Sequence, residues 1–163
     1  MLRFNSDHKF KIMQIADTQE IPAVSPDTLS LINNALDREK PDLVIFTGDQ
    51  IKGYSKKFKK DPAIIESTID ILVEPIAKRN IPFMVTYGNH DAQCGVDNRG
   101  QYKFYAKYDN FISGDLRNAD DVGTADIQIY SSTEDKPVFE LYIIDSHGKA
   151  KDGAGYAPVD KSK

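Results

Sequence analysis

Three short polar clusters contain the residues of this sequence that are best suited to bind a metal or transfer a proton. Each follows an apolar, strand-like run: Asp17 and Gln19 come after residues 11–16, Asp49 after 43–46, and Asn89, His90 and Asp91 after 81–85. Carboxylate and amide oxygens can bind a divalent cation, and an imidazole can transfer a proton near neutral pH. The sequence therefore predicts a metal-dependent acid–base site where the three clusters meet.

The cluster at residues 88–91 is the most distinctive of the three. Gly88 allows the backbone to turn sharply and to approach a bound group closely. Asn89 can offer its carbonyl oxygen to a metal, His90 can move a proton, and Asp91 can fix the tautomer of that imidazole. The alternative is a polar loop in which these three side chains satisfy one another. Similar clusters after two other strand-like runs favour a site over this alternative.

These clusters need elements that bring them to one place, and the first half of the chain supplies them. Apolar runs at 10–15, 43–46 and 81–85 predict three strands. Between them, Ser25 and Asp61 each precede a proline and a helical pattern of apolar residues, which predicts two capped helices. A β-α-β-α-β order predicts neighbouring parallel strands joined by right-handed crossovers. Ligands gather at the carboxyl ends of such strands, so we expect the three clusters to converge.

The rest of the chain predicts further elements but no additional site. Residues 1–9 are expected to form a short lead-in. Residues 101–111 predict a helix with an aromatic face packed in the core, and 126–131 with 138–145 predict a β-hairpin. His147 follows the last strand in a glycine loop, where an exposed histidine is more usual than a metal ligand.

The chain closely resembles the calcineurin-like metallophosphoesterases in the order of three motifs, which are Asp17-x-Gln19, Gly48-Asp49 and Gly88-Asn89-His90-Asp91. The resemblance extends over roughly residues 10–156 and is most specific at the third motif. It implies an α/β fold of the layered α/β/β/α type, with residues 1–163 forming one phosphoesterase domain that is incomplete at its carboxyl end. It also implies a hydrolase that cleaves phosphate mono- or diesters with water activated by two divalent metal ions.

By this resemblance, four residues are metal ligands: Asp17 and Gln19 for a first ion, Asn89 for a second, and Asp49 as the bridge between them. His90 is expected to protonate the leaving alkoxide, with Asp91 orienting its ring. Gln19 departs from the family, which usually has histidine at this place. Its amide oxygen makes the ligand set oxygen-rich, which favours manganese or magnesium over zinc and leaves iron open. In a second interpretation, Gln19 holds a water molecule near the metal.

The family's later histidine motifs, including a G-H-x-H sequence, are absent. Two alternatives to an active enzyme follow from this absence. The chain is either a non-catalytic module that binds a metal or a partner, or an incomplete part of a longer phosphoesterase. We expect it to expose an apolar sheet face, which a second copy of the chain or a missing carboxyl-terminal segment would cover.

Composition limits the compartment and the partners. With 40% hydrophobic and 28% charged residues among 163, the chain is expected to form one ordinary globular domain. The net charge of −4 gives no reason to expect a nucleic acid or an anionic membrane as partner. Cys94 is the single cysteine and no run suits a signal peptide or a membrane span, so the cytoplasm is the expected location. The lysine-rich segment 52–60 could attract an anionic phosphate ester, although a solvated loop is the more ordinary explanation.

Overall fold

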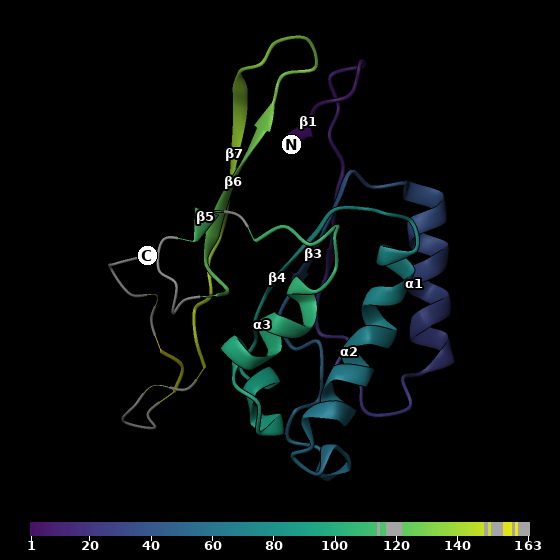
Figure 1. Cartoon of the computed structure of the whole chain (residues 1–163), viewed down its shortest axis with the longest axis vertical. Helices are drawn as coiled ribbons and strands as arrows, with labels where there is room; N and C mark the ends of the chain where they lie inside the picture. The colour runs from purple at the N-terminus through teal and green to yellow at the C-terminus, as the bar shows by residue number, and fades with distance from the viewer. Residues whose placement is uncertain (114, 117–121, 149, 151–154, 158, 160–163) are drawn as a thin grey trace.

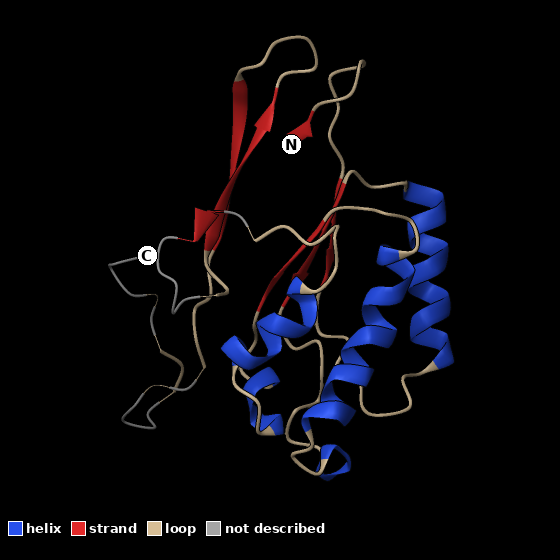
Figure 2. Cartoon of the chain, viewed as in Figure 1, coloured by secondary structure: helices blue, strands red, loops and turns tan. Residues whose placement is uncertain are grey.

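The computed structural model describes residues 1–113, 115–116, 122–148, 150, 155–157 and 159 (Figure 1). Two β-sheets pack face to face, and the helices cover the outer face of one of them (Figure 2). The described chain thus forms three of the layers of the predicted α/β/β/α sandwich. This arrangement confirms the α/β fold class, with the second sheet present beside the first.

The first sheet carries the predicted site. Its strands are β2 (Ile12–Ile15), β3 (Leu43–Thr47) and β4 (Phe83–Thr86), all parallel and in the order β2-β3-β4. Helices α1 (Pro26–Glu39) and α2 (Pro62–Ala77) connect them. The predicted β-α-β-α-β order is therefore confirmed, and the carboxyl ends of the three strands lie at one edge of the sheet.

Local sequence signals set the bounds of the two crossover helices. The Ser25 side chain accepts a hydrogen bond from Asp27 N, and the Asp61 side chain accepts one from Ala63 N at 2.9 Å. A proline follows each cap at the first helical position, where its missing N–H has no intrahelical partner to lose. α1 ends with Lys40 in the left-handed conformation. Both predicted helix starts are confirmed.

The second sheet is built around β6 (Ala125–Tyr130), which pairs antiparallel with β7 (Pro137–Ile143) as the predicted hairpin. Two short strands also pair with β6: β1 (Leu2–Arg3), in parallel, and β5 (Asp115–Leu116), antiparallel. The prediction that residues 1–9 form only a lead-in was wrong, because Leu2 and Arg3 enter this sheet. A strand of two residues is too short to produce a recognisable alternation of apolar residues.

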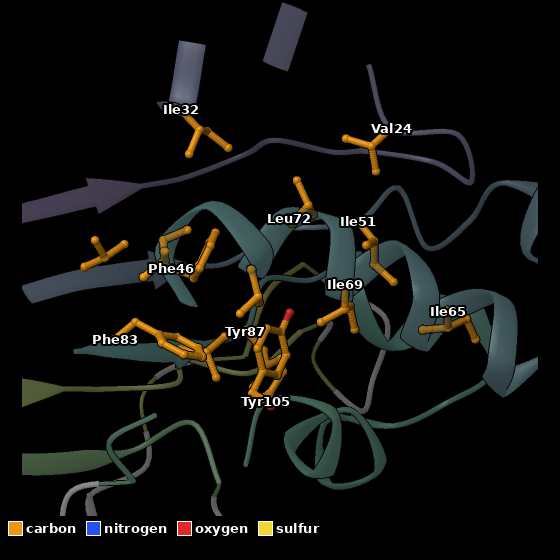
Figure 3. Close-up of a cluster of buried hydrophobic side chains, with 14 of the residues drawn as sticks. Val24, Ile32, Phe46, Ile51, Ile65, Ile69, Leu72, Phe83, Tyr87 and Tyr105 are labelled. Carbon is orange, nitrogen blue, oxygen red and sulfur yellow. The ribbon is translucent and has the colours of Figure 1, made fainter. Parts of the chain in front are cut away.

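The larger core lies between the helices and the first sheet (Figure 3). Phe46 and Phe83 from the sheet meet Leu72 from α2 and Tyr105 from α3 (Asn98–Ala106). Tyr105 is 2% exposed, so the aromatic face of α3 is core, as predicted. A smaller core between the sheets contains Leu43, Ile45, Met84, Ala125, Ile127 and Ile143. Strands β3 and β4 are therefore buried on both faces, which explains their nearly unbroken apolar sequences, while β2 leaves one face exposed.

The strand β7 carries apolar side chains on the surface. Val138 and Tyr142 are about half exposed, as is Ile144 just beyond the strand. The even spacing of the three places them on one face of the strand. In the part of the chain that the structure describes, no helix has the length and apolar character needed to cross a membrane.

Candidate metal centre

The loops that follow β2, β3 and β4 are joined by short hydrogen bonds. Asp17 N donates to Gly48 O at 3.1 Å, and Gln19 N donates to Asp49 O at 2.9 Å. From the third loop, His90 N donates to Asp49 Oδ1 at 2.9 Å. The structure therefore brings the backbones of the three predicted clusters together around Asp49. The convergence expected from the strand order is present, while the metal-binding roles of the side chains stay predictions.

Three predicted ligands have a left-handed backbone. The φ angle is 52° at Asp17, 43° at Gln19 and 54° at Asp49. Residues with a Cβ rarely adopt this conformation, which costs of order 1–3 kcal/mol at each position. Such outliers concentrate at binding and catalytic sites, where surrounding contacts hold them in place. Seven other described non-glycine residues share this conformation, so the informative feature is that these three occur together in joined loops.

Two glycines allow the second and third loops to approach each other. A Cβ on Gly88 would lie 2.0 Å from Asp49 Oδ1 and 2.5 Å from Asp49 N. Gly48 has a φ of 107°, and a Cβ there would lie 2.7 Å from Gly88 N. No larger residue could occupy either place without moving the backbone. The close approach predicted for Gly88 is present, and the group approached is the Asp49 carboxylate.

Asp91 is fully buried and ties the second loop to the third. Its Oδ2 accepts hydrogen bonds from Asp49 N at 2.8 Å and Gly88 N at 2.7 Å, and its Oδ1 accepts one from Ile51 N at 3.2 Å. Burial raises the pKa of the Asp91 carboxyl to about 6, against the opposing effect of the three N–H donors. Both loops depend on this one carboxylate for their position.

The prediction that Asp91 orients the imidazole of His90 was wrong in this detail. Asp91 opens the short 3-10 helix η2 (Asp91–Cys94) and points into the protein, where its oxygens meet backbone donors. The His90 ring instead contacts Gln93, with 3.0 Å between Nδ1 and Oε1. An amide oxygen only accepts, so this contact requires a proton on Nδ1. His90 Nε2 then remains available for chemistry.

Two contacts of the His90 ring were not predicted from the sequence. Gln93 lies three residues further on, at a spacing that brings side chains together in a helical turn, so it could have been anticipated. Tyr54 packs edge-on against the imidazole, with 4.7 Å between the ring centroids. Tyr54 lies far from His90 in the sequence, in the loop after β3. No sequence pattern links the two residues, so only the fold reveals the contact.

The donor chemistry suits an oxygen-preferring divalent cation. Asp49 is 8% exposed, Asp17 is exposed, and Gln19 and Asn89 are partly exposed. Among the described residues neither of the two carboxylates forms an ion pair with a basic side chain, so their charge is open to a cation. No group of three or more His, Cys, Asp or Glu side chains in the described ranges is placed to hold a metal. The two amides are therefore needed to complete the predicted ligand set.

The segment after β7 passes beside the third loop. Asp145 is buried and accepts hydrogen bonds from His147 N at 2.7 Å and Asn98 Nδ2 at 3.2 Å. A Cβ on Gly148 would lie 3.9 Å from Asn89 Cα. His147 was not predicted to have a role, and its ring is exposed, with Nδ1 3.8 Å from Asp145 Oδ2. This segment forms one wall around Asn89.

Cys94 is the last residue of η2 and is not part of the predicted ligand set. It is 1% exposed, and Gln101 Nε2 lies 3.5 Å from its Sγ. Burial raises the pKa of the thiol, which disfavours the nucleophilic thiolate. The turn of η2 places this residue in the core.

The comparison with known families decides the class of the protein. The model for the calcineurin-like phosphoesterases matches residues 10–159. This chain belongs to that family. The match confirms the resemblance inferred from the three motifs. Members of the family act on phosphate esters and generally bind divalent metals.

Curated relatives of this chain include a phosphatase and proteins named as probable inactive phosphatases. Phosphatase DCR2 of Saccharomyces cerevisiae is 33% identical, over 98% of this chain and 30% of the relative. Probable inactive purple acid phosphatase 14 of Arabidopsis thaliana is 28% identical, over 95% of this chain and 44% of the relative. Probable inactive purple acid phosphatase 29 of the same plant is 27% identical, over 89% and 42%. The chain spans less than half the length of each.

Proposed function

We propose that this chain supplies the metal site of a phosphoesterase that hydrolyses phosphate mono- or diesters. The observation that carries the proposal is the meeting of three loops around Asp49, with left-handed backbone at Asp17, Gln19 and Asp49. A structural loop has no need for three such residues at one edge of a sheet. A site in which several oxygen ligands must point to one cation does need such backbone conformations.

Each predicted ligand would hold a cation through an oxygen. Asp49 would bridge two ions, with Asp17 and Gln19 on the first and Asn89 on the second. Divalent ions bound there would neutralise charge on the phosphate and lower the pKa of a bound water. Manganese is the proposed metal because carboxylate and amide oxygens favour manganese or magnesium over zinc.

The reaction needs a proton donor on the side of the leaving group. The oxygen of water forms a bond to phosphorus while the ester P–O bond breaks, and the leaving oxygen must gain a proton. We assign this transfer to Nε2 of the doubly protonated His90 ring, whose Nδ1–H is held by Gln93. The ring becomes neutral as the leaving oxygen gains the proton, and the attacking water releases its own proton to solvent. Asp91 acts only through the loop backbones that it joins.

Hydrolysis of p-nitrophenyl phosphate with added manganese tests the proposal. His90→Ala should lower kcat by about 10²–10⁴ with little change in manganese affinity, because a general acid contributes to rate and holds no metal. Asp49→Ala should abolish both turnover and metal binding measured by calorimetry. Asp109→Ala, an exposed carboxylate away from the three loops, is the control and should change neither. Equal loss of metal in the first two variants would contradict the assigned roles.

A non-catalytic role is the second candidate. It is favoured by the small ligand set, which among the described residues contains no cluster of three acidic or histidine side chains. Two relatives are also named as probable inactive proteins. In that case manganese would bind in calorimetry, while p-nitrophenyl phosphate would not be hydrolysed at any metal concentration.

A further inference from the structure

A cavity of about 370 Å³ opens beside His90, outside the predicted ligand set. Its lining includes Tyr54 and Gln93 together with Lys56, Lys59 and Lys60. Tyr54 and Gln93 both also contact the imidazole of His90, Tyr54 edge-on and Gln93 at Nδ1. The cavity is therefore linked to the proposed acid through these two shared side chains, and His90 N in turn bonds to Asp49 Oδ1.

The loop that forms the cavity is fixed against the third loop. A Cβ on Gly53 would lie 2.0 Å from His90 O, so no larger residue could bring the two segments this close. On the far side, the stem of Lys60 packs on Gly95, where an added Cβ would lie 3.0 Å from Lys60 Cβ and Cγ. Phe58 is 1% exposed and anchors the loop in the core. The cavity wall is thus a built part of the fold.

The charge of the cavity is opposite to that of the whole chain. Three lysines line it, while the chain carries a net charge of −4. Among the described residues, Lys56, Lys59 and Lys60 form no ion pair with a carboxylate. A concave surface lined by charges of one sign concentrates ligands of the opposite sign. These ammonium groups are therefore available to an anionic ligand.

The contacts of His90 indicate where a substrate would meet the cavity. Gln93 lines the cavity and holds the Nδ1 end of the imidazole, so the cavity lies beside the proposed acid at the end opposite Nε2. We propose that this cavity binds a second phosphate group of the substrate, beside the phosphate at the predicted metal site. This assignment rests on the proposed function, through the role given to His90.

The alternative is that the lysines form a solvated surface loop. That explanation accounts for their exposure, but it requires neither a cavity nor shared contacts with His90. Pyrophosphate tests the difference because it contains a scissile phosphate and a second phosphate in one small molecule. In the absence of metal, Asp17 and Asp49 repel anions, so pyrophosphate should bind only at the lysines.

The first experiment measures binding without turnover. Isotope-labelled protein in EDTA is titrated with inorganic pyrophosphate, and the amide shifts of residues 53–60 and Gln93 are followed. Lys56→Gln/Lys60→Gln should weaken binding about tenfold, because two ammonium contacts to the anion are lost. Lys40→Gln/Lys103→Gln makes the same change in net charge elsewhere and should alter binding less than twofold. If the double variant does not fold, each single variant should show a smaller loss.

The second experiment uses the manganese-loaded protein. In Lys56→Gln/Lys60→Gln, kcat/KM for pyrophosphate should fall about tenfold while that for p-nitrophenyl phosphate stays within twofold. An equal fall for both substrates would overturn the proposal and show general attraction of anions. Pyrophosphate shifts that spare residues 53–60, or that persist in the variant, would also overturn it. If the protein hydrolyses nothing, the proposed function fails, while specific shifts at the cavity would still support the anion site.

Discussion

Gly88→Ala is the sharpest test of the idea that the loops around Asp49 are held at fixed positions. The new methyl group would lie 2.0 Å from Asp49 Oδ1 and 2.5 Å from Asp49 N. Rotation of the Asp49 side chain could relieve the first contact, but the second involves the backbone and forces one loop to move. Movement would also disturb the bonds from His90 N to Asp49 and from Gly88 N to Asp91.

The expected loss of stability combines these effects. Overpacking costs typically ~1–3 kcal/mol, and each disturbed hydrogen bond contributes ~0.5–1.5 kcal/mol. The free energy of unfolding should therefore fall by about 2–6 kcal/mol, a large part of the ~5–15 kcal/mol of a typical domain. Urea denaturation of the metal-free protein measures this change, and calorimetry should show that manganese binding is lost.

Gly148→Ala, in the segment after β7 that passes beside this loop, is the matched control. A Cβ there would lie 3.9 Å from Asn89 Cα, which is an ordinary van der Waals distance, and its backbone needs no positive φ. Its unfolding midpoint should stay near that of the unmodified chain. If the midpoints of Gly88→Ala and Gly148→Ala agreed within error, the close packing of the loops in solution would be refuted.

Three further predictions concern the loops, the metal and the surface. In Asp91→Asn, the amide hydrogen of Ile51 should exchange at least about tenfold faster, because one carboxamide oxygen cannot accept hydrogen bonds from all three N–H groups. Unchanged exchange would show that the loops do not depend on Asp91. Gln19→His should raise the affinity for zinc relative to manganese in calorimetry, because imidazole is a softer ligand; an unchanged ratio would favour the interpretation that Gln19 holds water. The chain should self-associate through the exposed face of β7, as measured by light scattering, and Val138→Lys/Tyr142→Lys should reduce this association. Association that persists in the variant would place the contact elsewhere.

The part of the fold that carries the site was predictable because its signals are local and repeated. Ser25 and Asp61 each start a helix, and three apolar runs form the parallel strands between and beside these helices. The carboxyl ends of neighbouring parallel strands lie side by side, and ligands bind at that end of such sheets. The convergence of the three clusters followed from this topology. The pairing of Leu2–Arg3 did not, because it depends on a partner more than a hundred residues away.

The details of the site depend on the directions in which side chains point, and a sequence does not contain this information directly. Neighbours in sequence, His90 and Asp91 point to different surroundings, the first to Gln93 and Tyr54 and the second to buried backbone donors. The type and order of the residues predicted a histidine–carboxylate pair. The geometry of η2 separates them, and a glutamine takes the place that was predicted for the carboxylate.

The carboxylate of Asp91 has a role that precedes metal binding. Its bonds to Asp49 N, Gly88 N and Ile51 N join the second and third loops through protein groups alone. The first loop is joined to the second by Asp17 N and Gln19 N, again without any metal. A cation that entered this site would meet oxygens whose backbones are already positioned, so less of its binding energy would be spent on ordering loops. We infer that the chain positions the Asp49 carboxylate first and binds metal second, and that the strained backbone at this edge is maintained by the fold itself.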